Sequence, residues 1–388
     1  MIKLVVCDGD GTLELPSPSQ STLALLKRMQ QLGIGLAVAS NSPRPFVESR
    51  FKQAGLAQPL ILVTSTDIGA LKPSPKFIEH ISTSTGIQPH EMIFLGDSDT
   101  TDIFCAINSH ILPFAALYSS KGQPKYGVGV TNPAELALYL ETFGMQSAPF
   151  FGWSFVSSKD AVEVYALIGD HGTMGLTAPL RSFLKNKQDV EVGTKKNTLG
   201  RILFHYFLSQ TYLSGLIQTA NYVAVYPGHA ANTQNLILSQ YSVLLQRVLG
   251  RRYLPSLLIR HTDTTPSHTV SGANRDIYQQ LSTVHLNPEY KKRLKGKRVF
   301  VLDDFTTSGN SLETARVMLL QGGAASVVGL AFAKWRTTYN IASINDTWNP
   351  YAPFPLSPAQ VTITQHTGML NPPADQYFSD VIWKAANT

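Results

Sequence analysis

Two aspartates, Asp8 and Asp10, stand two residues apart directly after an apolar run near the start of the chain. Residues 3–7 have the composition of a buried strand, and the glycines that flank Asp10 allow the backbone to approach a ligand closely. Two carboxylates at this spacing repel each other unless a divalent cation offsets their charge. Oxygen ligands of this kind suit Mg²⁺, which also accepts a phosphate oxygen. The pattern therefore predicts a magnesium-dependent phosphate site after the first strand.

A second group of polar residues follows the apolar run at residues 298–302. Asp303 and Asp304 come first, and a glycine-containing loop and a helical pattern follow them. Backbone amides at a helix start, together with the helix dipole and loop hydroxyls, can bind one phosphate dianion. The residues that could do so are Thr306, Thr307, Ser308, Gly309, Asn310 and Ser311. The alternative interpretation is that the two acids only cap an ordinary helix.

Alternating strand and helix patterns in both halves of the chain predict an α/β fold with two parallel sheets. In the first half a helix is expected around residues 22–32, between the first two of five strands: residues 3–7, 35–39, 60–64, 92–95 and 111–115. In the second half the expected strands are 162–168, 222–226, 257–260, 298–302 and 326–332, and the expected helices are 199–213, 233–249 and 311–321. Parallel strands bring their carboxyl ends to one edge, where α/β folds place their sites.

A chain of 388 residues has enough apolar material for two cores. We expect one domain over residues 1–145, a packed aromatic connection over 146–160 and a second domain over 161–388. The tail after Trp335 is rich in proline and lacks a periodic pattern, so an irregular C-terminal flank is expected there.

The apolar runs are too short to cross a bilayer, and the two cysteines, Cys7 and Cys105, lie in apolar runs that favour buried thiols. We therefore expect a cytoplasmic protein without a membrane partner. The net charge of +6 suits either nucleic acid or phosphorylated ligands. Because the basic run at residues 291–298 has the pattern of a solvated helix end, a nucleic-acid partner is disfavoured. A homodimer is compatible with the sequence.

The first half of the chain resembles the haloacid dehalogenase-like (HAD) phosphatase superfamily. The segment D-G-D-G-T-L, which begins at Asp8, is similar to the family's first motif, D-x-D-G-T-L, and Ser40-Asn41 after the second strand is similar to its second motif. The third-motif lysine is similar to Lys72 in A-L-K-P-S, and the fourth motif to G-D-S-D-T-T-D, which ends at Asp102. The resemblance implies a Rossmann-like domain in which Asp8 is the nucleophile that forms an aspartyl phosphate.

The same resemblance assigns the remaining roles. Asp10 would be general acid and then base, and Lys72 would neutralise phosphate charge. Ser40 and Asn41 would hold the transferring phosphoryl group. The Mg²⁺ site would use Asp8, Asp10, Asp97 and Asp102, with Asp99 as an alternative to Asp102 for supporting the metal or Lys72. For any single acid the alternative is a turn or helix cap.

The spacing of these motifs leaves no room for an inserted cap domain. Only about 30 residues separate Asp8 from Ser40, and about as many separate Ser40 from Lys72. The site is therefore expected to be open, so that it either accepts a bulky substrate or borrows the second domain as a lid.

The string V-F-V-L-D-D-F-T-T-S-G-N-S resembles the phosphoribosyl pyrophosphate (PRPP) motif of type I phosphoribosyltransferases, most closely their competence-factor branch. The resemblance implies that Asp303 and Asp304 bind the ribose hydroxyls and that residues 306–311 bind the 5-phosphate. Gly228 and His229 stand where the family has its pyrophosphate loop, although a loop histidine bonded to backbone is an equal alternative for His229. Residues 257–265 and 267–275 resemble the hood loop.

One departure from the second family concerns Thr307, which stands where purine-using relatives have an aspartate. We therefore expect an acceptor other than a purine. The combined prediction is a bifunctional enzyme that transfers 5-phosphoribosyl from PRPP to a small acceptor and then hydrolyses the 5-phosphate. The alternatives are a phosphatase regulated by an inactive phosphoribosyltransferase-like sensor, and a nucleic-acid uptake or stress adaptor.

Overall fold

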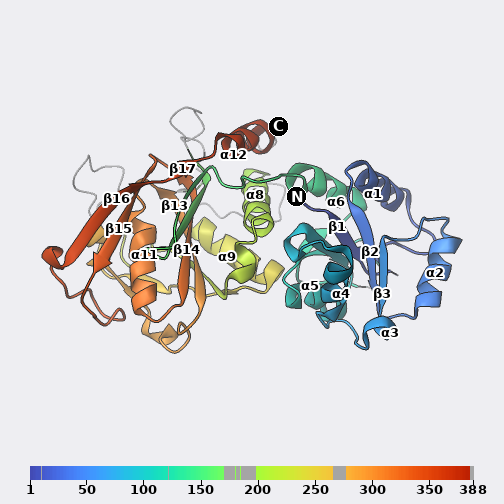
Figure 1. Ribbon diagram of the computed structural model, residues 1–388, viewed down its shortest axis with the longest axis horizontal. Helices are drawn as coiled ribbons and strands as arrows, with labels where there is room; N and C mark the ends of the chain where they lie inside the picture. The colour runs from blue at the N-terminus through green and yellow to red at the C-terminus, as the bar shows by residue number, and fades with distance from the viewer. Residues whose placement is uncertain are drawn as a thin grey trace. The chain divides into compact units, whose positions relative to one another are not determined.

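The computed structural model describes residues 1–9, 11–120, 122–169, 180, 184, 198–264 and 277–384, and the chain divides into two compact units (Figure 1). Unit 1 comprises Met1–Ser147, Thr211–Gln218 and Leu245–Gly250. Unit 2 comprises Ala148–Gln210, Thr219–Leu244 and Arg251–Thr388. Each unit is built on its own sheet of mainly parallel strands, so the prediction of an α/β fold is confirmed.

Unit 1 contains a six-stranded parallel sheet in the order β3-β2-β1-β4-β5-β6. Its strands are β1 (Leu4–Cys7), β2 (Gly35–Ser40), β3 (Ile61–Thr64), β4 (Met92–Gly96), β5 (Leu112–Ala116) and β6 (Val128–Val130). The five predicted strands are present, whereas β6 was missed because V-G-V is too short to show a pattern. The strand order places the carboxyl end of β1 between those of β2 and β4.

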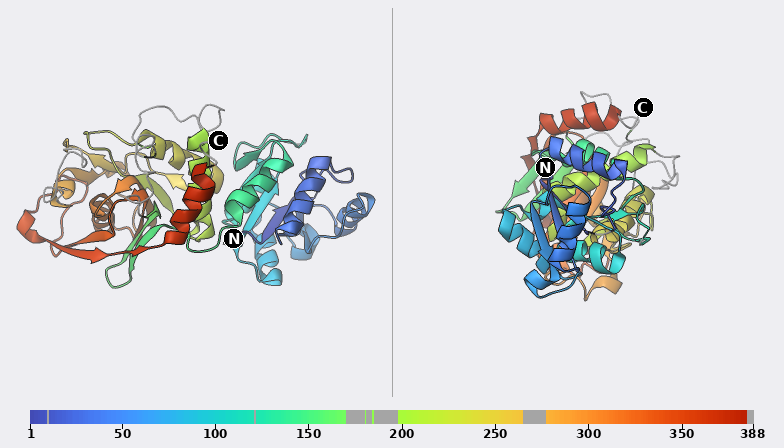
Figure 2. Two further views of the ribbon diagram at one scale, coloured as in Figure 1. Left: turned by 90° about the horizontal axis from the view of Figure 1, so that it is seen from above. Right: turned by 90° about the vertical axis from the view of Figure 1, so that its right-hand side faces the viewer.

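Helices cover both faces of this sheet. They are α1 (Gln20–Gln31), α2 (Arg44–Gln53), α3 (Ser65–Ile68), α4 (Lys76–Thr85), α5 (Phe104–Asn108) and α6 (Pro133–Tyr139). Phe77 and Ile81 of α4 and Cys105 of α5 share one core with Val6 and Phe94 of the strands. Helices α1 and α6 lie side by side (Figures 1 and 2). Burial on both faces explains why the central strands are continuous apolar runs.

Unit 2 contains a seven-stranded sheet in the order β10-β9-β13-β14-β8-β7-β17. The strands from β10 to β8 are parallel, and β7 and β17 are antiparallel additions at one edge. Their bounds are β7 (Trp153–Ser157), β8 (Val162–Ile168), β9 (Tyr222–Val225), β10 (Arg252–Tyr253), β13 (Arg298–Thr306), β14 (Ser326–Lys334) and β17 (Met369–Leu370). Two small antiparallel sheets pair β11 (Leu258–Arg260) with β12 (Val284–Leu286), and β15 (Thr338–Ile344) with β16 (Val361–Thr367).

The helices that lie wholly or mainly in unit 2 are α8 (Thr198–Leu213), α9 (Leu236–Leu249), α10 (Ile277–Leu281), α11 (Asn310–Gln321) and α12 (Pro372–Tyr377), and the last residues of α8 and α9 belong to unit 1. Phe207 of α8 and Tyr241 of α9 contact Phe332 of β14, with ring centroids 5.4 and 5.7 Å away. Helix α11 contributes Leu312 and Met318 to a core shared with β13. In the chain as a whole, the described residues also form short 3₁₀ or π turns at Pro89–Glu91, Asp99–Ile103, Leu140–Gly144, Ile217–Thr219, Pro288–Tyr290, Pro358–Gln360 and Phe378–Trp383.

The expectation of an irregular C-terminal flank is wrong. The tail after Trp335 contains the β15–β16 hairpin, β17 and α12. The residues of β16 are mostly exposed, so the strand lacks the apolar alternation that marks a half-buried strand. Strand β7 lies within residues 146–160, which the sequence predicted as a connection, and it extends the sheet by pairing with β8.

Glu313 anchors this hairpin to α11. Its side chain is completely buried, and its carboxylate accepts hydrogen bonds from the Tyr339 hydroxyl and the Ala342 amide, both at 2.8 Å. Arg316 forms an ion pair with it from one turn further along the helix. A buried carboxylate with this set of donors is well compensated, so β15 is fixed against the start of α11.

Cys7 and Cys105 are free and buried, as predicted, and burial raises the pKa of the Cys105 thiol to about 12. Within the described ranges the structure has no helix that combines the length and the apolar character needed to cross a bilayer.

Replacing Tyr339 with phenylalanine tests the hairpin anchor. Losing one hydrogen bond to a buried carboxylate should lower the free energy of unfolding of unit 2 by about 1–3 kcal/mol. All four tryptophans lie in unit 2, so tryptophan fluorescence during urea unfolding reports on that unit. Tyr126→Phe, at a half-exposed position in unit 1, is the matched control. An unchanged midpoint for Tyr339→Phe would show that the contact does not hold the hairpin.

Candidate functional site

Lys72 lies at the centre of a charge cluster at the carboxyl edge of the unit 1 sheet. Its Nζ atom is 2.7 Å from Asp8 Oδ1 and 2.6 Å from Asp102 Oδ1. Lys72 is 5% exposed and Asp102 is 1% exposed, so these contacts are shielded from water. An ammonium group shared by two carboxylates offsets part of the cost of burying these charges.

The protonation of the cluster follows from this arrangement. Burial alone would lower the pKa of Lys72, but the charges of Asp8 and Asp102 outweigh it and raise the pKa above its ordinary value. Burial raises the pKa of Asp102, and the negative charges of Asp8 and Asp97 add to this, whereas Lys72 opposes it. Lys72 therefore remains an ammonium at physiological pH and keeps a fixed positive charge beside Asp8.

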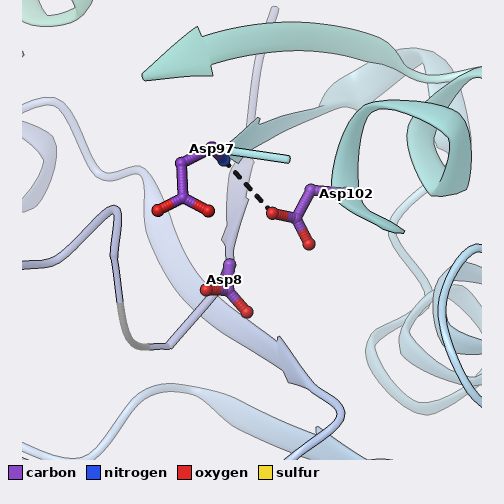
Figure 3. A group of neighbouring side chains, drawn as sticks. All are labelled: Asp8, Asp97 and Asp102. Carbon is purple, nitrogen blue, oxygen red and sulfur yellow. Dashed lines mark hydrogen bonds between the residues drawn. The ribbon is translucent and has the colours of Figure 1, made fainter. Parts of the chain in front are cut away.

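Three carboxylates converge beside Lys72 (Figure 3). Asp8 follows β1, Asp97 follows β4, and Asp102 lies in the Asp99–Ile103 turn; one oxygen from each lies within 4.8 Å of the others. Asp102 Oδ2 accepts hydrogen bonds from the backbone amides of Asp97, at 3.1 Å, and Ser98, at 3.2 Å. Asp102 thus fixes the turn that carries Asp97.

The donor set suits Mg²⁺, which prefers carboxylate oxygens. Because both oxygens of Asp102 are bonded to Lys72 or to backbone amides, Asp8 and Asp97 are the better candidates to hold the ion directly. Two positions beside Asp97 must be glycine, because any side chain there would collide with Asp97. A Cβ atom on Gly11 would lie 1.6 Å from Asp97 Oδ2, and one on Gly122 would lie 2.0 Å from the Asp97 carbonyl oxygen.

Sequence reasoning missed Ser119, which orients Asp97. The Ser119 hydroxyl, just beyond β5, donates to Asp97 Oδ2 at 2.6 Å, and both residues are buried. The neighbouring Tyr118 hydroxyl donates to the Thr12 carbonyl at 2.7 Å and so supports the loop after β1. The signal that could have identified Ser119 is its place just after a strand that ends at the same edge.

The other predicted residues of this site are placed as follows. Ser40 is the last residue of β2 and accepts a hydrogen bond from the Ser42 amide at 3.0 Å. Asn41 Oδ1 accepts from the Lys72 amide at 2.8 Å and so ties the second motif to the third. Asp99 instead accepts from the Lys125 amide at 2.9 Å, outside the cluster. Asp10 lies outside the described residues.

Asp303 and Asp304 lie within β13, the strand between β9 and β14. They do not cap a helix, because the N-cap of α11 is Gly309, so that alternative interpretation is wrong. Asp303 Oδ1 accepts from the Asp304 amide at 2.9 Å, and Asp304 Oδ1 accepts from the Phe305 amide at 2.6 Å. Both acids precede the loop that leads into α11.

The loop of residues 306–311 forms a tight strand-to-helix turn. Thr306 Oγ1 accepts from the Gly309 amide at 3.1 Å. Gly309 has φ of 80°, and a Cβ atom there would lie 2.2 Å from the Tyr339 ring, so glycine is required on both grounds. The backbone N–H of Asn340, in β15, donates to the Ser308 carbonyl at 2.8 Å, and the side-chain Nδ2 of Asn340 donates to Asn310 Oδ1 at 2.9 Å. The hairpin therefore supports the outer side of this loop.

The predicted pyrophosphate loop follows β9. The Gly228 amide donates to the Thr233 carbonyl at 3.0 Å, and the buried Arg260 donates from Nε to the Gly228 carbonyl. His229 is exposed, and its carbonyl accepts from the Thr264 amide at 2.9 Å. Its imidazole forms no hydrogen bond within the part of the chain that the structure describes. Of the predicted hood, residues 257–264 are described and residues 265–276 lie outside the described ranges.

Comparison with known proteins assigns the N-terminal region. The sequence profile of the haloacid dehalogenase-like hydrolase family matches residues 11–116. The N-terminal region is a HAD-like domain. The resemblance that the four motifs predicted is thus confirmed for this part of the chain, whereas the likeness of unit 2 to phosphoribosyltransferases stays a prediction.

Curated relatives of this HAD-like domain include proteins named phosphoglycolate phosphatase. The one from Vibrio vulnificus (strain CMCP6) is 34% identical over 101 residues, 26% of this chain and 44% of the relative. The one from Vibrio parahaemolyticus is 28% identical over 110 residues, 28% of this chain and 46% of the relative. The chain thus spans less than half the length of these relatives. A solved HAD phosphatase from Thermococcus onnurineus is 21% identical with a TM-score of 0.30, covering 32% of this chain and 58% of that chain.

Replacing Lys72 with methionine tests the charge cluster. Without the ammonium, Asp8 and the buried Asp102 repel each other, and unit 1 should lose about 3 kcal/mol of stability at pH 7. The pKa of Asp102 is already raised by burial and rises further in this variant. Protonation of Asp102 should therefore restore part of the lost stability as the pH falls from 7 toward about 4, the ordinary pKa of an aspartate.

Urea unfolding followed by far-ultraviolet circular dichroism measures this effect in the full chain. Lys76→Met, at an exposed position in α4, is the matched control and should unfold like the wild type. Equal stability of the Lys72→Met and Lys76→Met variants at both pH values would contradict the electrostatic account.

Proposed function

We propose that unit 1 hydrolyses phosphomonoesters through an aspartyl phosphate on Asp8. The observation that carries this proposal is the Lys72 ammonium 2.7 Å from Asp8, with Asp97 and Asp102 converging on the same point. Asp8 would act as the nucleophile, and the fixed charge of Lys72 beside it would stabilise the phosphoryl oxygens. The name of the Vibrio relatives, phosphoglycolate phosphatase, favours the same class of substrate.

The proposed reaction has two steps. One Asp8 oxygen attacks phosphorus, the bond to the leaving oxygen breaks, and Asp10 gives that oxygen a proton. Asp10 then takes a proton from water, which attacks phosphorus and releases phosphate from Asp8. Ser40 and the backbone around Asn41 would hold the phosphoryl oxygens at the end of β2. Mg²⁺ bound by Asp8 and Asp97 would supply positive charge that draws the substrate phosphate to Asp8.

Asp8→Asn tests the nucleophile. The variant should lose at least about 1000-fold in kcat on a generic phosphomonoester, because an amide oxygen is a poor nucleophile. Asp99→Asn, which changes an acid outside the cluster, should retain wild-type activity. Chelation of Mg²⁺ should abolish turnover and added Mg²⁺ should restore it. Activity of Asp8→Asn equal to that of Asp99→Asn would rule out the aspartyl phosphate.

For unit 2, we infer that the loop of residues 306–311 binds the 5-phosphate of PRPP and that Asp303 and Asp304 bind its ribose hydroxyls. The likeness of the motif supports this inference, as does the placement of both acids on a strand that leads into a glycine turn and a helix start. Gly228 and His229, after the neighbouring strand β9, would contact the pyrophosphate. The position of Thr307 favours an acceptor other than a purine.

The two proposed chemistries form a sequence. Transfer to a small acceptor breaks the bond between ribose C1 and pyrophosphate and yields a 5-phosphoribosyl compound. Hydrolysis in unit 1 would then remove the 5-phosphate and leave a free riboside. We propose this two-step ribosylation as the function of the full chain.

Incubation with PRPP, Mg²⁺ and candidate acceptors tests the sequence. Pyrophosphate should appear first and inorganic phosphate second, and a variant with Asp303→Asn and Asp304→Asn should release neither from this substrate pair. The same variant should keep wild-type hydrolysis of a generic phosphomonoester. Altered phosphatase control without any pyrophosphate release in the wild type would favour the sensor hypothesis instead.

A further inference from the structure

Lys334, the last residue of β14, is a buried lysine without a carboxylate partner among the described residues. Its side chain is fully buried. The Nζ atom donates to the carbonyl oxygens of Thr307 and Thr338, both at 2.7 Å, and lies 4.2 Å from the ring centroid of Trp153 on β7. Burying an ammonium group without an opposite charge is costly, so packing alone does not account for a lysine here.

The Thr307 carbonyl that Lys334 holds belongs to the predicted phosphate loop. The peptide bond between Thr307 and Ser308 is trans, so its N–H points to the side opposite to its carbonyl. The contact with Lys334 therefore turns the Ser308 N–H away from the lysine. In the described chain this N–H donates to no protein acceptor, whereas the next amide, that of Gly309, is bonded to Thr306. The loop thus presents an oriented N–H group from which an anion could accept a hydrogen bond.

The charge of Lys334 depends on what occupies the loop. Burial lowers the pKa of Lys334 to about 7. The groups that contact its ammonium, two backbone carbonyls and an indole ring, do not titrate. Arg336, in the turn that follows β14, is exposed. On the neighbouring strand β13, Thr306 pairs with Lys334, and Asp304 lies two residues before Thr306 but forms no ion pair with Lys334. A phosphate dianion against the loop would favour the protonated lysine.

We propose that Lys334 is a positioning residue that orients the peptide between Thr307 and Ser308 toward the 5-phosphate and takes up a proton from solvent when the phosphate binds. This inference rests on the function proposed for unit 2. It adds a charge that the motif itself does not contain. It also couples ligand binding to protonation.

Titration calorimetry of the full chain with PRPP and Mg²⁺ tests this inference at about pH 8, in two buffers of different ionisation enthalpy. An Asp8→Asn background prevents hydrolysis of the ligand in unit 1. At this pH the phosphate groups of the ligand are already deprotonated, since their second pKa is about 6. The background protein should therefore take up close to one proton on binding.

Three substitutions in this background separate charge from packing. Lys334→Arg keeps a permanent charge and should bind without proton uptake. Lys334→Met keeps most of the volume and should bind roughly 10-fold to 100-fold more weakly, also without uptake. Lys295→Met removes an exposed lysine and should behave like the background protein.

The outcomes distinguish this inference from the function on which it rests. Failure of the background protein to bind PRPP overturns both. Binding without proton uptake, or equal uptake by the background protein and Lys334→Arg, overturns the role of Lys334 and leaves the PRPP site intact. Proton uptake by Lys334→Arg, compared with uptake by the background protein, tests the role of Lys334 even if tryptophan fluorescence shows that Lys334→Met is unfolded.

Discussion

The ammonium of Lys72 between two carboxylates is the contact on which the first site depends. Three acids gathered within a few ångströms repel one another, and each pair at about 4 Å costs about 4 kcal/mol at an effective dielectric constant of about 20. Lys72 offsets much of this energy and ties together the end of β1, the connection between α3 and α4 and the turn after β4. The charge balance of the site is therefore also a constraint on the packing of three segments.

Unit 2 uses buried basic side chains in a different way. Lys334 and Arg260 each donate to the carbonyl oxygen of a predicted ligand loop, at Thr307 and Gly228. Neither forms an ion pair in the described parts of the chain. Unit 1 balances its buried charge within the protein, whereas unit 2 places Arg260 and the titratable Lys334 where an anionic ligand could balance their positive charge.

The sequence predicted those features that local pattern determines. Apolar runs located most strands of both sheets, and the place of Asp8 directly after the first strand identified it as a site residue. Asp97 and Asp102 were identified by the resemblance of their segment to the fourth family motif. Ser119 was missed because its contact with Asp97 depends on the register between β4 and β5, which no local pattern encodes. Lys334 was missed because a lysine at the end of an apolar strand resembles a solvent-exposed terminus. Its burial depends on Trp153, which lies in a segment that the sequence predicted to be a connection.

The place of β17 in the second sheet has a consequence for how the protein is made. Met369 and Leu370 pair with Ser154 and Trp153, so the outer edge of β7, the first strand of this sheet along the chain, is covered only by residues that follow it at a long distance in the sequence. During synthesis from the N-terminus, β7 is therefore left with an open edge while all the residues between β7 and β17 emerge from the ribosome. The nascent chain is most exposed to mispairing in this interval, and a truncation before residue 369 would make that exposure permanent.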